Sequence, residues 1–281
     1  MDNSIVLGYW GLRGRAQVPR LLLAYTGINF TNKTYTSPEQ WFGGDKQKLG
    51  LDFPNIPYLI DGKLKITESE AISRYIIKKS GKLELLGKNL ADEGLVDTMI
   101  GVIGDITVPT LELCFNPKFN EEKAKIFTDK IKPKLELLYK FLLFKDWLTG
   151  YLTFADFQLV EIVNYLNGIW PDDIKQQFPK LLALRDRFNN LEAIKSYYAK
   201  EDAVKGPFLP PTAKWFGWFK QIEYLWDSFQ WEIDFEYTEF VLVERSIPAS
   251  FEARPPWVRF IIGFAYNNIY MSDDRDIPKS L

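Results

Sequence analysis

The stretch from Leu51 to Tyr75, LDFPNIPYLIDGKLKITESEAISRY, constrains the fold of this chain most strongly. Tyr58 to Asp61 and Leu64 to Thr67 are two short β-rich runs. Asp61-Gly62 between them is a hairpin signal, because both residue types tolerate positive φ. Glu68-Ser69 then opens a run whose apolar residues recur at helical spacing. The stretch therefore predicts a β-hairpin followed at once by a helix.

Two features of this stretch are compatible with ligand binding, although each has a plainer explanation. A helix that begins so close behind a strand has free backbone N–H groups that favour an anion. Glu68 and Ser69 there suit a ligand with a carboxylate and an ammonium, but ordinary N-capping also explains them. Pro57 is either a strand starter or a cis proline that turns Asn55 and Ile56 toward a ligand. Spacing alone leaves these alternatives open.

Upstream of this stretch, the pattern is that of a small α/β unit. Residues 4–8 form a β-rich run, which the turn-like sequence Gly8-Tyr9-Trp10-Gly11 is expected to end. Residues 15–25 have helical spacing, residues 29–35 form a second β-rich run, and residues 37–48 indicate a loop with a short helix. We expect a mixed sheet with helices on its faces, in a domain of residues 1–83.

Downstream of residue 88, helical patterns replace strand patterns. A long helix is expected from Asn89 or Asp92 to Phe115. Thr153 and Asp156 resemble a capping box, with Asp in place of Glu, that opens a buried helix. The expected helices cover residues 89–115, 121–143, 154–166, 179–188 and 191–198. The chain is thus predicted to continue as an all-α domain of residues 89–211.

The last 70 residues, 212–281, differ in character from the rest of the chain. They contain 17 aromatic residues, five of the nine tryptophans, and 7 basic against 11 acidic residues. Aromatic and aliphatic residues recur at helical spacing from Trp215 to Phe229. We expect this aromatic, acidic extension to pack either on the preceding domain or on a partner protein.

Composition excludes several classes of function. The chain has no histidine, which excludes His-based triads, Cys–His dyads and His-ligated metal sites. Its single cysteine, Cys114, excludes an internal disulfide and suits a reducing compartment such as the cytoplasm. A net charge of −2 gives no reason to expect nucleic acid. The sequence predicts no membrane span and no targeting peptide before the first strand.

The tyrosine at the end of the first strand is a candidate for chemistry. Its phenol could donate a hydrogen bond to an anion such as a thiolate, but spacing alone favours a packing role for Tyr9.

Several motifs taken together resemble the glutathione transferases of the mu class, over about residues 3–215. The matching segments are Gly8-Tyr9-Trp10, Leu12-Arg13-Gly14, Lys48 to Asn55, Pro57 to Gly62, Asn116-Pro117, Phe154, Asp156-Phe157 and Phe178-Pro179. The resemblance implies a thioredoxin-like glutathione-binding domain, an all-helical domain and a homodimer with shared sites. It also implies glutathione as co-substrate, no metal, and a cis Pro57.

The resemblance further implies a role for each matching site residue. Tyr9 looks like the catalytic hydroxyl that favours the glutathione thiolate, and Phe53 and Arg74 look like dimer contacts. An aspartate from the neighbouring subunit is expected to reach the site, and Asp105 is at its position. The residues expected to contact glutathione are Trp10, Trp41, Lys46, Asn55, Ile56, Glu68, Ser69 and Asp105.

Four positions depart from the mu-class pattern. Arg15 replaces a leucine beside the thiol, where its charge could stabilise a thiolate or crowd the electrophile pocket. Pro38 replaces a glutathione-binding arginine, which should weaken affinity. Glu68 replaces a glutamine, and Phe115, in the electrophile pocket, replaces a tyrosine that assists some substrates. The extension has no counterpart in the family.

Two hypotheses follow. The first is an enzyme that joins glutathione to small electrophiles, which Tyr9, Asn55, Ser69 and Asp105 favour. The second is a transferase-like subunit of a larger assembly, docked through residues 212–281, which Pro38, Phe115 and the extension favour. Binding to immobilised glutathione and the oligomeric state of the native protein distinguish them.

Overall fold

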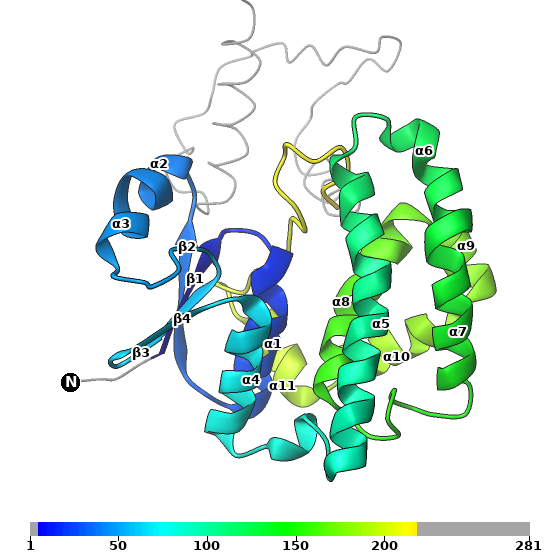
Figure 1. Ribbon diagram of the computed structural model, residues 1–281, viewed down its shortest axis with the longest axis horizontal. Coiled ribbons are helices and arrows are strands. Elements are labelled where there is room, and N and C mark those ends of the chain that lie inside the picture. The colour runs from blue at the N-terminus through cyan, green and yellow to red at the C-terminus, as the bar shows by residue number, and fades with distance from the viewer. Residues whose placement is uncertain (1–4, 218–281) are drawn as a thin grey trace, which may run out of the picture.

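The computed structural model describes residues 5–217 (Figure 1). A four-stranded sheet lies near the N-terminus, in the strand order β2-β1-β3-β4. It consists of β1 (Ile5–Trp10), β2 (Phe30–Tyr35), β3 (Tyr58–Asp61) and β4 (Leu64–Thr67). β1 runs parallel to β2 and antiparallel to β3, and β3 pairs with β4 as a hairpin. The mixed sheet confirms the predicted α/β unit.

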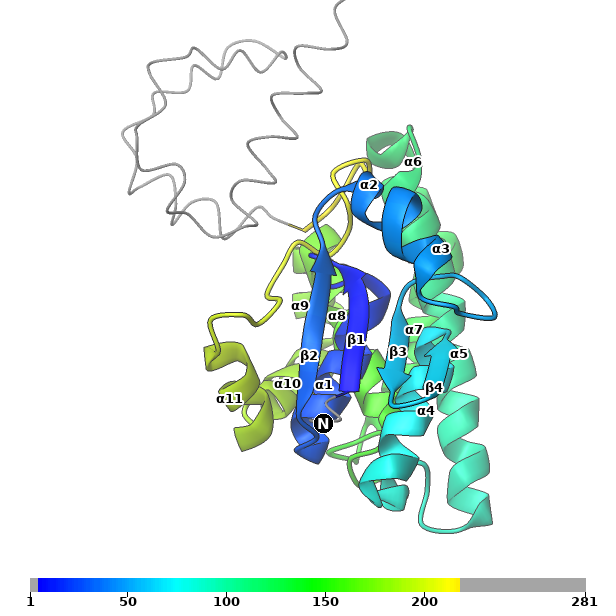
Figure 2. The ribbon, with the colours of Figure 1, turned by 90° about the vertical axis from the view of Figure 1, so that its left-hand side faces the viewer.

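Helices cover both faces of the sheet. α1 (Gln17–Thr26) and α4 (Ser69–Ser80) pack on each other between the sheet and the helical domain. α2 (Pro38–Gln40) and α3 (Lys46–Lys48) lie on the opposite face (Figure 2), with a π-helical turn over Trp41–Asp45 between them. The stretch expected to be a loop with one short helix is therefore mostly helical.

The first strand is longer than expected. It continues through Gly8 to Trp10, which pairs with Tyr35, so the predicted turn begins only at Gly11. The Tyr58 ring occupies the place where a Cβ on Gly8 would lie, 2.1 Å away. Pairing with strands on both sides thus outweighs the weak strand preference of glycine here. The hairpin turn is also shifted, because Asp61 pairs with Leu64 and leaves Gly62-Lys63 as the loop.

The second domain is helical, as predicted. Its helices are α5 (Leu90–Phe115), α6 (Phe119–Ile126), α7 (Lys132–Leu142), α8 (Phe154–Ile169), α9 (Pro171–Gln177), α10 (Pro179–Asn189) and α11 (Glu192–Ala199). α9 was not predicted, and a π-helical turn at Phe127–Ile131 divides the expected helix 121–143. The capping box of α8 is confirmed by the bonds that Thr153 and its backbone N–H donate to Asp156, at 3.0 and 2.8 Å.

Both domains share one hydrophobic core. Buried residues of α1 and α4, such as Leu22 and Ile76, belong to the same cluster as those of α5 and α8. α8 is central, since most of its residues are buried. The relative placement of the two domains is therefore held by apolar packing as well as by the polar contacts described below.

Among the described residues, α5 is the one helix that is long and apolar enough to cross a membrane, judged by length and composition alone. Its most apolar window has a mean hydropathy of 1.4, which the sequence analysis did not anticipate. Val96, Ile103 and Ile106 of α5 are nonetheless buried, and the helix packs against α8. α5 is thus a core helix of the domain.

The chain after α11 folds back over the domain boundary. The N–H of Phe208 donates to the carbonyl of Phe216 at 2.9 Å, and the N–H of Lys214 donates to the carbonyl of Cys114 at 2.7 Å. Trp215 is only 8% exposed and lies against Gly168 of α8. The remaining expectations for the extension, from Trp218 onward, fall outside the described residues.

Candidate active site

Tyr9 lies near the end of β1 in a small apolar cluster. It packs with Leu12 and Ala16, and Ile56 contacts the same cluster. Its side chain is 8% exposed, and its hydroxyl oxygen accepts the backbone N–H of Arg15 at 3.2 Å. Burial raises the pKa of the Tyr9 hydroxyl, and the Arg15 N–H offsets part of that rise. Tyr9 is therefore a neutral phenol at pH 7 whose proton is available to an anion.

The turn after β1 brings Arg15 to this phenol. Gly14 has a φ of +40°, and a Cβ there would lie 2.7 Å from the Tyr9 hydroxyl. Only glycine fits this position without moving Tyr9. Arg15 follows in a 3₁₀ turn at Gly14–Ala16, with its side chain exposed.

The wall beside Tyr9 is formed by the segment before β3. The Ile56-Pro57 peptide bond is cis, which resolves one alternative that the sequence left open. Ile56 is half-buried, and its backbone N–H donates to Oδ1 of the exposed Asn55 at 2.9 Å. Ile56 packs against the Tyr9 cluster, next to the polar group of Asn55.

The start of α4 is the third component. Glu68 has a φ of +69°, and it is the only non-glycine residue with positive φ in residues 5–217. Its side chain makes no capping hydrogen bond to the helix, so ordinary N-capping does not account for it. Such strain is typical of functional positions. Ser69 is half-buried and begins the helix, where free N–H groups face the same end.

Trp10, Trp41 and Lys46 surround the π-helical turn. Trp41 is 2% exposed and stacks on Tyr58 with ring centroids 6.0 Å apart, so packing accounts for most of its surface. Trp10 is half-buried and lies 6.2 Å from Phe42. The Lys46 Nζ lies over Phe42 at 5.3 Å. Trp10 and Lys46 remain accessible to a ligand, whereas Trp41 is largely enclosed.

The other predicted residues do not contact Tyr9 within one chain. Asp105 on α5 pairs with Lys134 at 2.7 Å, and Arg74 on α4 pairs with Asp97 of α5 at 2.7 Å. Phe53 is 76% exposed in the loop before β3. Phe115 is 47% exposed at the C-terminal end of α5. Phe53 therefore has apolar surface, and Asp105 has polar surface, that is available to another chain.

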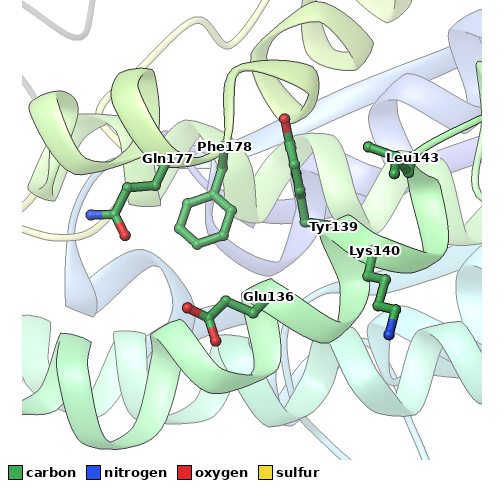
Figure 3. Close-up of a pocket in the computed structure, with 6 residues that line it drawn as sticks. All are labelled: Glu136, Tyr139, Lys140, Leu143, Gln177 and Phe178. Atoms are coloured by element: carbon green, nitrogen blue, oxygen red, sulfur yellow. The ribbon is translucent and has the colours of Figure 1, made fainter.

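Two surface cavities lie away from Tyr9. One of about 300 Å³ lies between α7 and the turn from α9 to α10, where Tyr139 and Phe178 pack edge to face (Figure 3). The other, of about 350 Å³, is lined by the end of α1, the start of β2 and the end of α11. Neither is lined by a residue predicted to bind glutathione. Within residues 5–217 there is also no cluster of three or more Cys, Asp or Glu that could hold a metal.

Comparison with known proteins identifies the family. Residues 5–78 match the glutathione S-transferase N-terminal domain, and residues 104–201 match the glutathione S-transferase C-terminal domain. Glutathione S-transferase Mu 1 of Bos taurus is 35% identical over 219 residues, which cover 75% of this chain and 98% of that relative. The chain belongs to the glutathione S-transferase family.

Other relatives agree with this assignment. Glutathione S-transferase Mu 1 of Homo sapiens is 36% identical over 219 residues, covering 75% of this chain and 98% of that relative. The crystal structure of the glutathione S-transferase Blo t 8 superposes with a TM-score of 0.67 at 28% identity, over 75% of this chain and 99% of that one. A structure of rat hPGDS complexed with a quinoline gives a TM-score of 0.60 at 27% identity, over 69% of this chain and 96% of that one. The mu-class resemblance and the glutathione S-transferase fold are thereby confirmed.

Several charged contacts beside this family site, some of them buried, were not predicted from the sequence. Arg13 forms an ion pair with Glu161 of α8, and Arg20 is fully buried beneath the turn after β1. Burial lowers the pKa of Arg20 to about 10, so it remains a cation at pH 7. Lys33 pairs with Asp45, which also accepts the Tyr35 hydroxyl at 2.7 Å. The available signal was a charge inside an apolar run, as at Arg20 before Leu21-Leu22-Leu23.

Proposed function

We propose that this chain is a glutathione transferase that joins the glutathione thiolate to small electrophiles. The buried Tyr9 hydroxyl carries the proposal, because it retains its proton and has its acceptor side occupied by the Arg15 N–H. A phenol in that state is a hydrogen-bond donor for a thiolate in a site from which water is excluded.

The chemistry requires only that the thiol be ionised near neutral pH. A free thiol has a pKa near about 8.5, and the thiolate is the nucleophile. Lowering that pKa by about two units corresponds to roughly 2.7 kcal/mol, which one donor in a dry site can supply. The thiol loses its proton to solvent, and Tyr9 keeps its own proton and stabilises the resulting thiolate. The sulfur then forms a bond to the electrophilic carbon, and the electron pair of the broken bond goes to a leaving group or to an opened ring or double bond that solvent protonates.

Glutathione would lie along the wall from Ile56 to α4. The strained Glu68 and the hydroxyl of Ser69 would hold the γ-glutamyl end, which carries both charges. Asn55 and Ile56 would contact the cysteinyl part, since Ile56 packs against the Tyr9 cluster. Trp10 and Lys46 would surround the glycine end, with Trp41 supporting them from beneath.

The departures from the mu-class pattern change the surroundings of the proposed site and leave Tyr9 in place. The exposed Arg15 follows the Gly14 turn, so its guanidinium can approach the sulfur and favour the thiolate. Pro38 is the first residue of α2, and it supplies no cation for the glycine carboxylate. We therefore expect weaker glutathione binding than an arginine would give. Phe115 offers the electrophile an apolar contact without a hydroxyl.

A homodimer in the cytoplasm is the second part of the proposal. The exposed Phe53 would insert into the partner subunit, Arg74 would lie near the dimer axis, and Asp105 of the partner subunit would approach the γ-glutamyl end. Gly94, Gly101 and Gly104 leave an open face on α5 that allows close approach of another helix. The buried Cys114 thiol is compatible with a reducing compartment.

The proposal is tested with the purified full chain on immobilised glutathione and with a generic aryl halide as electrophile. We expect retention on the resin, elution by free glutathione, and conjugation that depends on the protein. Failure of both retention and conjugation would rule the proposal out.

A second function is favoured by Pro38, Phe115 and the extension: a transferase-like subunit of a larger assembly, docked through residues 212–281. Trp215 packs into the helical domain, so its indole would not be part of such a docking surface. Native gel electrophoresis of protein from its own source tests it. If the protein migrates as a simple homodimer, and removal of residues 218–281 leaves its oligomeric state unchanged, the subunit function is excluded.

A further inference from the structure

A buried ion pair joins the two domains beside Tyr9. The Arg13 Nε and Nη2 atoms donate to Oε1 and Oε2 of Glu161 at 3.0 and 2.5 Å. The two side chains are 7% and 10% exposed. Burial by itself would lower the pKa of Arg13, but the Glu161 carboxylate outweighs it, and the Arg13 pKa lies above its usual value. Arg13 is thus a cation held in the interior beside the Glu161 carboxylate.

Stability alone is a weak reason for such a pair. Desolvation of two charges offsets much of their attraction, and apolar replacements of similar volume are often neutral or stabilising. A two-pronged guanidinium–carboxylate contact does, however, define direction and distance. The Arg13–Glu161 pair is therefore better explained by the part of the chain that it holds in place.

Arg13 belongs to the turn that leads from Tyr9 to Arg15, and the helical domain holds this turn from one side. The Arg13 N–H donates to the carbonyl of Pro207 at 2.8 Å, and the Gly14 N–H donates to that of Phe208 at 3.0 Å. We call residues 205–217 the strap. The Phe208 ring of the strap lies 4.7 Å from the Arg13 guanidinium carbon, so the strap packs on the ion pair itself.

Arg20 holds the same turn from beneath. Its Nη1 donates to the carbonyl of Leu12 at 2.8 Å, and its Nη2 donates to that of Trp10 at 3.3 Å. Backbone groups of the turn are thus bound from both sides. The next N–H along the chain, that of Arg15, is the one that donates to the Tyr9 hydroxyl.

We propose that Arg13 and Glu161 are a positioning pair for Tyr9. By fixing the turn against α8 and the strap, they keep the Arg15 N–H on the phenolic oxygen. A hydroxyl with its acceptor side occupied directs its proton to the remaining side, which is where the proposed glutathione sulfur lies. The inference rests on the proposed function for its effect on sulfur, but the effect on the turn is independent of glutathione.

The test compares three full-length variants with the wild type. Glu161→Gln removes the charge and keeps the shape, and Glu161→Asp keeps the carboxylate. Asp146→Asn is the matched control. It removes the carboxylate from an ion pair with Arg187 in the same domain, where the Asp146 side chain is 73% exposed. Arg13→Lys is used if Glu161→Gln does not fold, since lysine keeps the charge and loses the planar fork.

The first measurement needs no glutathione. Backbone amide exchange of residues 10–16 should accelerate about tenfold in Glu161→Gln, with exchange in the core of α8 unchanged. The second is the ultraviolet absorbance of the thiolate in the glutathione complex as a function of pH. Its midpoint should rise by about one unit in Glu161→Gln, with Glu161→Asp restoring much of the shift and glutathione affinity nearly unchanged.

The outcomes separate the two claims. Wild-type exchange of the turn together with a wild-type thiolate midpoint in Glu161→Gln would overturn the positioning pair, as would an equal response in Asp146→Asn. If the wild type forms no thiolate, the proposed function fails, and the exchange measurement still decides whether the pair positions the turn. Faster exchange confined to residues 10–16 would then support the pair.

Discussion

Tyr9 shows how much one residue depends on its surroundings. A phenol at the surface has its O–H solvated and gives a thiolate little beyond what water gives. In this fold the phenol is 8% exposed, is packed by Leu12 and Ala16, and accepts a backbone N–H. Under the proposed function, the hydrogen bond to sulfur would thus be prepared before glutathione binds.

Replacing Tyr9 by phenylalanine should remove that hydrogen bond, and it also removes the acceptor of the Arg15 N–H. We expect kcat/KM for conjugation at pH 7 to fall by about 10²-fold, since a donor of this kind contributes roughly 2.7–4 kcal/mol. The control is Tyr151→Phe, because the Tyr151 hydroxyl also accepts a backbone N–H, from Lys88 at 3.0 Å, and donates to Asp92 at 2.8 Å. Steady-state kinetics of both variants provide the comparison. Equal losses in the two would remove Tyr9 from the mechanism.

Among single residues, the sequence was sufficient to pick out those that match a family motif. It did not reveal those whose role depends on buried contacts with distant parts of the chain. Tyr9, Asn55 and Ser69 are marked by their neighbours in the sequence. The Arg13–Glu161 pair joins residues 148 positions apart, and no local pattern predicts such a contact. The strained φ of Glu68 and the enclosure of Trp41 by Tyr58 also depend on tertiary packing, which no local sequence pattern predicts.

Among the elements, the prediction was best where a pattern has one physical solution. The hairpin and α4 followed from alternation, a turn residue and helical spacing, and α5 and α8 followed from their caps. The end of β1 was wrong because ladder pairing on both sides outweighed a glycine. α9 was missed because seven residues between two prolines contain too little periodicity.

The capping box of α8 should be important for stability. Asp156 is fully buried and accepts the backbone N–H groups of Leu148 at 2.9 Å and Thr153 at 2.8 Å. Asp156→Ala would leave both donors buried without acceptors, so we expect a loss of about 2–4 kcal/mol in the free energy of unfolding. Urea denaturation measures it. Asp186→Ala on α10, where the carboxylate is 59% exposed, should cost about 0.5 kcal/mol or less.

For the whole molecule, Trp215 is a residue of the extension that packs on the helical domain within the described residues. Trp215 lies against Gly168 with ring contacts to Tyr165 and Phe208, at 5.6 and 5.8 Å. A chain cut after Lys214 loses this indole, whereas a chain cut after Gly217 keeps it. The first should be less stable by about 3–5 kcal/mol, as for removal of a large core side chain. Equal unfolding midpoints of the two truncated chains would contradict this packing.

Self-association is the second property of the whole molecule. Phe53 is 76% exposed, so its ring is available to the partner subunit of the proposed homodimer. Phe53→Ala should weaken the proposed homodimer by about 2 kcal/mol or more, or at least about 30-fold in the dissociation constant. Sedimentation equilibrium measures this constant. Phe144→Ala, which removes a ring that is 95% exposed after α7, should leave it unchanged.

The central claim is that the fold lowers the pKa of a bound glutathione thiol through Tyr9. It is tested most directly by titrating the ultraviolet absorbance of the thiolate in the complex with the full chain. We predict a midpoint about two units below the value of about 8.5 for a free thiol, and a return toward that value in Tyr9→Phe. A bound thiol that ionises as it does in water, with or without Tyr9, would contradict the account.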